Sequence, residues 1–191
     1  MVRKSYVAFL ERLAQKIHEV DPNRPVFASE EHDNIRLIGA IHDFKQHAPS
    51  LDAIGVNSYY EKNVRELVEI FETFDSERPY AVTEFGPKGY WNKELGDFWN
   101  DSILVEVSSL SKGEYYHKQW TQYIEANKGR NLGGFAFSWQ DRFEGTATWF
   151  GITDFKGNLK PAYHYLASAW LGTEVEQEAF PDLSIVGNWQ G

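Results

Sequence analysis

Hydrophobic residues along the chain follow two alternating patterns. Apolar positions three and four residues apart are typical of helices that bury one face, whereas short apolar runs are typical of buried strands. The helical pattern predicts helices over residues 5–20, 33–47, 63–74, 111–124 and 161–170. The apolar runs predict strands over residues 26–29, 51–57, 80–84 and 132–139.

These patterns give an element order of one helix followed by four strand–helix units. Strands that alternate with helices at this spacing predict a parallel sheet with right-handed crossovers. Four units fit either a small open sheet or half of an eight-stranded barrel. We therefore predict an α/β protein with a partial (β/α)8 TIM barrel over residues 1–172, and a tail or the start of a further segment over residues 173–191.

Two loops rich in aromatic residues interrupt this alternation. Residues 85–110 show no clear period and hold Trp91 and Trp99, and a second such loop follows the last strand. The first is far longer than the usual strand-to-helix connection, and loops of that length are usually functional or disordered. It leads into Ser111-Lys112-Gly113-Glu114, a capping-box pattern that predicts a helix start at Ser111.

Composition narrows the classes of function. The net charge is −9, which argues against a nucleic-acid or anionic-membrane partner, because both need a basic face. No apolar stretch approaches the roughly 20 residues of a membrane helix, and no signal peptide is evident, so we expect a soluble chain whose compartment stays open. Aromatic residues reach 16%, which favours either a large aromatic core or a cleft that stacks the flat faces of sugar rings.

Polar, ionisable and aromatic residues gather where the predicted strands end. These strand ends are Ser29-Glu30-Glu31-His32, Asn57-Ser58-Tyr59-Tyr60, Thr83-Glu84-Phe85-Gly86-Pro87 and Trp139-Gln140-Asp141-Arg142. In parallel sheets and barrels, sites form at the carboxyl ends of the strands. Glu84 is the strongest candidate for a catalytic carboxylate, although a buried glutamate satisfied by an arginine or by backbone groups would give the same pattern.

Three of these segments resemble strands 6, 7 and 8 of retaining glycoside hydrolases of clan A, most closely the catalytic barrel of family 2. The segments are residues 51–60, 78–86 and 132–141, and residues 21–26 are similar to that family's connection into strand 5. The resemblance covers residues 5–170. It implies the C-terminal half of the barrel, strands 5 to 8, and retaining hydrolysis or transfer of β-linked glycosides without a cofactor.

The resemblance also implies roles for individual residues. Glu84 would be the nucleophile, Tyr59 or Tyr60 would donate a hydrogen bond to its carboxylate, and Trp139 would form the aromatic floor under the sugar. Either tyrosine would otherwise be a packed ring. The remaining residues that we expect to contact substrate are Asn57, Glu31, His32, Trp91 and Trp149.

The chain departs from the family pattern at the second carboxylate. The family's acid/base glutamate follows an asparagine at the end of strand 4, and no segment of this chain corresponds to that strand. Glu30 and Glu31 follow the strand aligned with strand 5, so together with His32 they are expected to line the rim or bind a hydroxyl. Asp141 and Arg142 are expected to form an ion pair or to contact ligand, and Glu144 has the same two interpretations.

Two other classes of function stay open. The chain could be a non-catalytic remnant that binds carbohydrate, or a half-barrel scaffold that self-associates or joins a missing N-terminal half. An oligo- or polysaccharide is the expected ligand. We expect no metal site, because the six histidines show no ligand spacing on one helix face.

Overall fold

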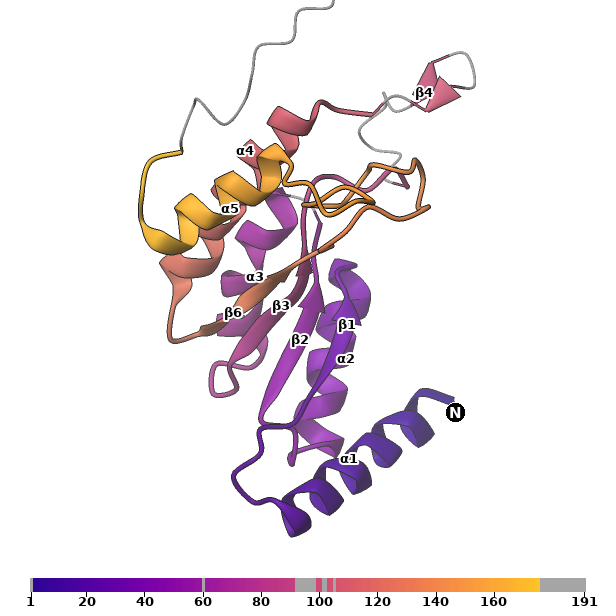
Figure 1. Cartoon of the computed structure of the whole chain (residues 1–191). Helices are drawn as coiled ribbons and strands as arrows, with labels where there is room; N and C mark the ends of the chain where they lie inside the picture. The colour runs from indigo at the N-terminus through magenta and orange to yellow at the C-terminus, as the bar shows by residue number, and fades with distance from the viewer. Residues whose placement is uncertain (1, 60, 92–98, 101–102, 105, 176–191) are drawn as a thin grey trace, which may run out of the picture.

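The computed structural model describes residues 2–59, 61–91, 99–100, 103–104 and 106–175, and Figure 1 shows its course. The helices are α1 (Val2–Val20), α2 (Asn34–His47), α3 (Glu61–Phe74), α4 (Ser109–Gln119) and α5 (Pro161–Leu171). The strands are β1 (Phe27–Glu31), β2 (Ala53–Asn57), β3 (Tyr80–Phe85), β4 (Trp99–Asn100), β5 (Ile103–Leu104) and β6 (Asn131–Ala136). A π-helical turn (Trp120–Ile124) and a 3-10 turn (Glu125–Asn127) continue α4.

The main sheet has four parallel strands in the order β1-β2-β3-β6. A helix follows each of these four strands before the next strand of the main sheet begins, so the predicted series of four strand–helix units after α1 is confirmed. The fold is a partial TIM barrel. Its register places Asn57 at the end of β2 directly beside Glu84 of β3, so the two central strands bring their polar ends together.

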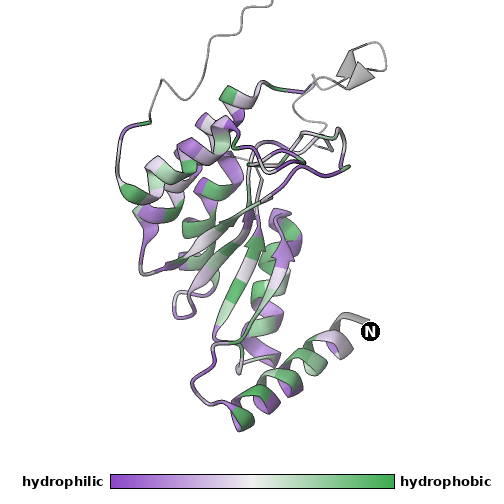
Figure 2. Cartoon of the chain, viewed as in Figure 1, coloured by the Kyte–Doolittle hydropathy of each residue, from purple (hydrophilic) through white to green (hydrophobic). Residues whose placement is uncertain are grey.

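The core lies between the sheet and its helices. Ile54, Val56, Tyr80 and Val82 of the central strands belong to the same buried cluster as Leu37, Ile41 and Phe44 of α2 and Leu67 and Phe71 of α3. Figure 2 shows the hydrophobic bands of α2 and β2 that result. The rings of Phe71 and Tyr80 stack with their centroids 4.5 Å apart. Because each fully buried large apolar side chain contributes roughly 1.5–3 kcal/mol, this layer fixes the sheet on which the strand ends sit.

On the other face of the sheet, Gly55 lets three strands approach closely. A Cβ atom at this position would lie 2.5 Å from Ser29 Oγ of β1 and 2.7 Å from Thr83 Cγ2 of β3. Thr83 is itself held, because its hydroxyl donates to Asn57 Oδ1 at 2.7 Å. The absence of a side chain at Gly55 therefore leaves room for the side chains of Ser29 and Thr83 beside it.

The two outer strands differ from the prediction of buried strands. Within the described residues, β1 pairs only with β2 and β6 pairs only with β3. Phe27 of β1 is partly exposed, and Leu132 and Phe135 of β6 are 60% and 62% exposed. An apolar run is therefore not enough to predict burial, which also requires a neighbouring strand on each side.

The starts of α1 and α4 and the end of β6 are among the boundaries that differ from the prediction. α4 begins after Ser108, whose Oγ accepts a hydrogen bond from the Ser111 amide, so the capping box predicted to open at Ser111 is wrong. β6 ends at Ala136, three residues before the predicted end at Trp139. α1 begins at Val2 rather than at Ser5. Among the described residues, no helix is both long and apolar enough to cross a membrane.

Candidate active site

The carboxyl ends of β1, β2 and β3 open into a cavity of about 460 Å3, which we call the strand-end pocket. Three carboxylates, one arginine, one histidine and four aromatic rings contribute to its wall. The lining residues are Glu31, His32, Asn57, Tyr59, Asn63, Glu84, Gly89, Tyr90, Trp91, Phe137, Arg142 and Glu144. The pocket thus brings together Glu84 and five of the other predicted site residues, namely Asn57, Tyr59, Glu31, His32 and Trp91.

Glu84 and Tyr59 form the central contact of the pocket. The Tyr59 hydroxyl donates a hydrogen bond to Glu84 Oε2, as expected for one of the two tyrosines after β2. Burial raises the pKa of Tyr59 well above its usual range, and the hydrogen bond to Glu84 raises it further. Tyr59 therefore stays protonated and keeps its donor role across the physiological range. Tyr60 lies outside the described residues.

Backbone hydrogen bonds tie the strand ends to one another around this contact. The Ser58 amide donates to the Glu84 carbonyl at 2.8 Å, and the His32 amide donates to the Asn57 carbonyl at 3.1 Å. On the other side, the Phe137 amide donates to the Phe85 carbonyl at 2.8 Å. The residues of the pocket are thus positioned by the sheet as well as by loops, which favours a fixed geometry.

His32 contributes a neutral ring to the pocket wall. Its Nε2 lies 2.8 Å from Asn34 Oδ1 and its Nδ1 lies 2.8 Å from Ser58 Oγ. Because an amide oxygen only accepts, Nε2 carries the proton and Nδ1 accepts from the Ser58 hydroxyl. Burial lowers the pKa of His32, which favours the neutral form. Glu31 lies further out on the rim, with Arg36 Nη1 3.7 Å from its carboxylate.

Aromatic rings enclose Tyr59 on several sides. Its ring lies 5.3 Å from Trp91 and 5.5 Å from both Phe137 and Phe150, measured between ring centroids. The contacts to Trp91 and Phe137 are edge-to-face, an arrangement that aromatic pairs prefer. Trp91 and Phe137 also line the pocket, where they offer apolar surfaces to a ligand.

Two predicted contact residues lie elsewhere. Trp139 does not line the strand-end pocket; it is 66% exposed and its ring lies 6.5 Å from that of Tyr163. The reason is the early end of β6, after which Phe137 rather than Trp139 faces Tyr59. Trp149 is only 1% exposed, and its indole Nε1 donates to the Lys88 carbonyl at 2.9 Å, so it is a core residue.

The loop after β6 supplies an ion pair to the pocket wall. Arg142 Nη2 lies 2.7 Å from Glu144 Oε2, and the guanidinium carbon lies 4.3 Å from the centre of the Phe137 ring. Of the two interpretations of Asp141 and Arg142, the ion pair between them does not form, because Asp141 pairs with Lys160 at 2.7 Å instead. No sequence spacing indicates that pairing, since Lys160 lies at the start of a helix 19 residues away.

Four lining residues were not among the predicted contacts: Asn63, Gly89, Tyr90 and Phe137. Tyr90 and Gly89 lie in the long aromatic-rich loop after β3, which was predicted from its length to be functional or disordered. Phe137 lay inside the predicted last strand rather than at its end, and Asn63 lay in a predicted helix, so neither was expected to contact substrate. Within the described part of the chain, no group of three or more ligand-type side chains could hold a metal ion.

No protein-family model matches the chain, and no curated protein has a similar sequence. Solved structures are similar in fold. A xylanase from Cellvibrio japonicus is 14% identical with a TM-score of 0.62, over 84% of this chain and 54% of the xylanase. A β-glucuronidase from Bacteroides uniformis is 16% identical with a TM-score of 0.62, over 86% of this chain and 20% of that protein. A family 39 β-xylosidase from Caulobacter crescentus is 16% identical with a TM-score of 0.57, over 87% and 36%.

The likeness defines a class of fold. These neighbours are glycoside hydrolases of clan A, and the chain shares their TIM-barrel fold. At this level of identity the likeness shows the fold alone. The chain spans about half the length of the xylanase and a smaller share of the other two.

Proposed function

We propose that the chain is the nucleophile-bearing half of a retaining glycoside hydrolase that acts on β-linked glycosides. The observation that carries the proposal is the hydrogen bond from Tyr59 to Glu84 at the strand ends of a barrel fold. A carboxylate on a rigid strand, held by one donor and facing a pocket walled by Trp91 and Phe137, has the features of a covalent nucleophile. The finer assignment to family 2 is part of the proposal.

In the proposed chemistry, the Glu84 carboxylate attacks the anomeric carbon of the sugar. The bond from that carbon to the glycosidic oxygen breaks, and its electron pair leaves with the aglycone, which a general acid protonates. Water then attacks the anomeric carbon and gives its proton to the conjugate base of that acid. The bond to Glu84 breaks, which releases the sugar and restores the carboxylate. Retaining enzymes place the general acid about 5–5.5 Å from the nucleophile. In the family that the sequence resembles, this residue follows strand 4, to which no segment of this chain corresponds. We therefore assign no general acid within this chain.

The test is intact mass after incubation with a panel of activated 2-deoxy-2-fluoro β-glycosides. Their leaving group needs no general acid, so the test isolates the nucleophile. We expect a mass increase of one sugar on the wild-type chain and none on Glu84→Gln. Glu31→Gln and Glu144→Gln remove the other two carboxylates of the pocket and should still form the adduct.

Peptide mapping should place the sugar on the segment that contains Glu84. If folded wild-type protein forms no adduct with any member of the panel, the nucleophile assignment is wrong. Sugar binding without an adduct, measured by calorimetry, would then favour the alternative of a non-catalytic carbohydrate-binding protein.

We also propose that the sheet edges that are unpaired among the described residues associate, either with a second copy or with a complementary half-barrel. Unpaired edge strands with exposed apolar side chains favour association, and Leu132 and Phe135 on β6 provide both features. We expect the chain alone to elute as a dimer or larger species on a sizing column with light scattering. Phe135→Lys should shift it toward the monomer, whereas a wild-type monomer at all concentrations would contradict association with a second copy.

A further inference from the structure

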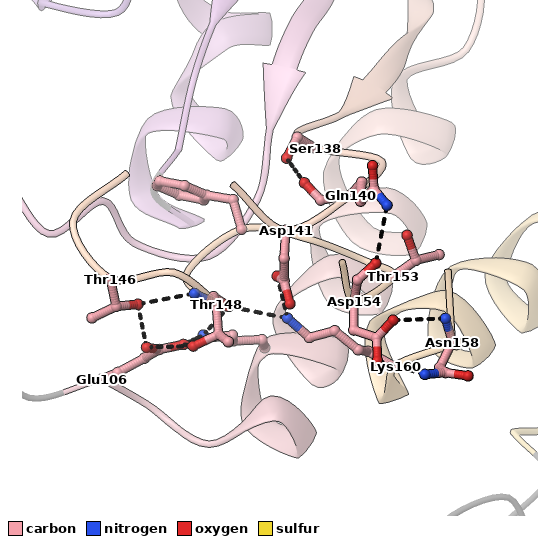
Figure 3. A network of polar contacts seen from close by, with 12 residues as sticks. Glu106, Ser138, Gln140, Asp141, Thr146, Thr148, Thr153, Asp154, Asn158 and Lys160 are labelled. Atoms are coloured by element: carbon pink, nitrogen blue, oxygen red, sulfur yellow. Dashed lines mark hydrogen bonds and ion pairs between the residues drawn. The ribbon is translucent and has the colours of Figure 1, made fainter. Parts of the chain in front are cut away.

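Behind the strand-end pocket lies a group of four charged residues, which we call the four-charge cluster: Glu106, Lys112, Asp141 and Lys160. Lys112 pairs with Glu106, and Lys160 Nζ lies 2.7 Å from Asp141 Oδ1. The side chains of Asp141 and Lys112 are only 1% and 4% exposed. Figure 3 shows most of the cluster with the threonines around it. Buried charges persist only when paired, and here two cations meet two anions.

The four-charge cluster converges on one short segment of backbone. Both ammonium groups donate to the Thr148 carbonyl, Lys112 at 3.1 Å and Lys160 at 3.0 Å. From the other side, the hydroxyls of Thr146 and Thr148 donate to the Glu106 carboxylate, the latter at 2.9 Å. The segment from Thr146 to Thr148 is therefore held by cations at its carbonyl and by a carboxylate at its hydroxyls.

The location of the two lysines is unfavourable for the helices that carry them. Lys112 lies in the first turn of α4, and Lys160 occupies the N-cap position of α5. A positive charge at the start of a helix opposes the helix dipole, and Lys160 makes no side-chain cap. Burial also lowers the pKa of Lys112, and the hydrogen bond that Lys112 donates to Glu106 opposes this effect. Positions that break local rules are expected at functional sites.

The held segment leads directly to the residues that pack on Tyr59. Trp149 and Phe150 follow Thr148 and form one buried cluster with Tyr59, Tyr90 and Phe137. The Phe150 ring lies 5.5 Å from the ring of Tyr59, whose hydroxyl reaches Glu84. A continuous set of contacts thus runs from the four-charge cluster through Phe150 to Tyr59 and to the carboxylate.

We infer that the four-charge cluster is a positioning device for the proposed nucleophile, acting through Phe150 and Tyr59. This inference rests on the proposed role of Glu84. The cluster fixes the backbone at Thr148, the backbone fixes the Phe150 ring, and the ring holds Tyr59 at the angle at which its hydroxyl meets Glu84. Lys160 and Lys112 are positioning residues that contact no substrate.

The test is a double-mutant cycle between Lys160 and Tyr59, read by the rate of covalent labelling at Glu84. We expect Lys160→Met to lower the maximal labelling rate about tenfold, with the half-saturating concentration little changed, because small misplacement of reacting groups is costly. Lys160→Arg should restore most of the rate. In the Tyr59→Phe background, Lys160→Met should have almost no further effect, since the device then has nothing to position.

Two further variants guard against simple loss of the fold. Asp141→Asn with Lys160→Met removes both charges of one pair together, and should label as slowly as Lys160→Met while retaining wild-type melting. The double variant Glu125→Gln/Lys128→Met removes an exposed ion pair and should leave labelling unchanged. Additive effects of Lys160→Met and Tyr59→Phe, or an unchanged labelling rate in Lys160→Met, would overturn the inference.

A separate readout covers the case in which wild-type protein is not labelled, which would contradict the proposed function alone. Hydrogen exchange followed by mass spectrometry should then show faster exchange in Lys160→Met at Glu144, Thr148 and Ile152, whose amides are hydrogen-bonded. Peptides from α2 should exchange as in the wild type. Unchanged exchange at residues 144–152 would overturn the positioning role itself.

Discussion

Tyr59→Phe is expected to slow covalent labelling of Glu84 about 100-fold while leaving the fold unchanged. The substitution removes only the hydroxyl that donates to Glu84, and the phenyl ring keeps its contacts with Trp91 and Phe137. Without its donor, the carboxylate is free to rotate, and misplacement by about 1 Å can cost roughly 100-fold in rate. The measurement is the labelling rate with an activated 2-deoxy-2-fluoro glycoside, beside the melting temperature.

A matched control accompanies this test. Tyr163→Phe removes a tyrosine hydroxyl outside the strand-end pocket and should leave the labelling rate unchanged. If Tyr59→Phe labels at the wild-type rate, the hydrogen bond has no part in the reaction.

Trp149→Ala is expected to lower the free energy of unfolding by about 3–5 kcal/mol, the usual cost of truncating a buried tryptophan. The ring is 1% exposed, and its loss would also leave the Lys88 carbonyl without the indole donor. For a chain of this size, the change corresponds to a fall in melting temperature of roughly 10 °C. The measurement is thermal unfolding followed by circular dichroism.

Trp91→Ala is the matched comparison, because Trp91 lines the strand-end pocket and is partly exposed. It should change the melting temperature much less and weaken sugar binding instead, measured as the half-saturating concentration for labelling. Both tryptophans were predicted to contact substrate. Comparing the two variants therefore distinguishes a residue of the hydrophobic core from a residue of the binding pocket. An equal fall in melting temperature in both variants would contradict the different roles that we assign to the two tryptophans.

The order of the elements could be predicted because each strand–helix unit shows its own period. The place of Glu84 and Tyr59 followed from the rule that sites form at the carboxyl ends of parallel strands. Trp139 was misplaced because β6 ends at Ala136, so the period of two that would put Trp139 on the same face as Phe137 no longer holds there. An aromatic residue in a loop also carries no sign of whether it will be buried, as Trp149 and Trp91 demonstrate.

Ion pairs between residues far apart in the chain could not be predicted from the sequence, for a different reason. Asp141 has Arg142 beside it in the chain, yet its partner is Lys160, which only the path of the loop between them brings near. Exposure of β1 and β6 likewise depends on what lies beyond each edge. Both features are set by tertiary arrangement rather than by local pattern.

Glu84 lies on β3 and Tyr59 lies just after β2, the two central strands, while each outer strand is paired on one side only among the described residues. If the proposed chemistry holds, this chain can form the covalent intermediate with activated glycosides, whereas complete turnover also requires a second polypeptide that supplies the general acid. The chain would then behave as one piece of a split enzyme, silent on natural glycosides until a complementary piece joins it. The absorbance of a chromogenic aglycone, released only after the two pieces join, would then measure the assembly of a barrel from its halves.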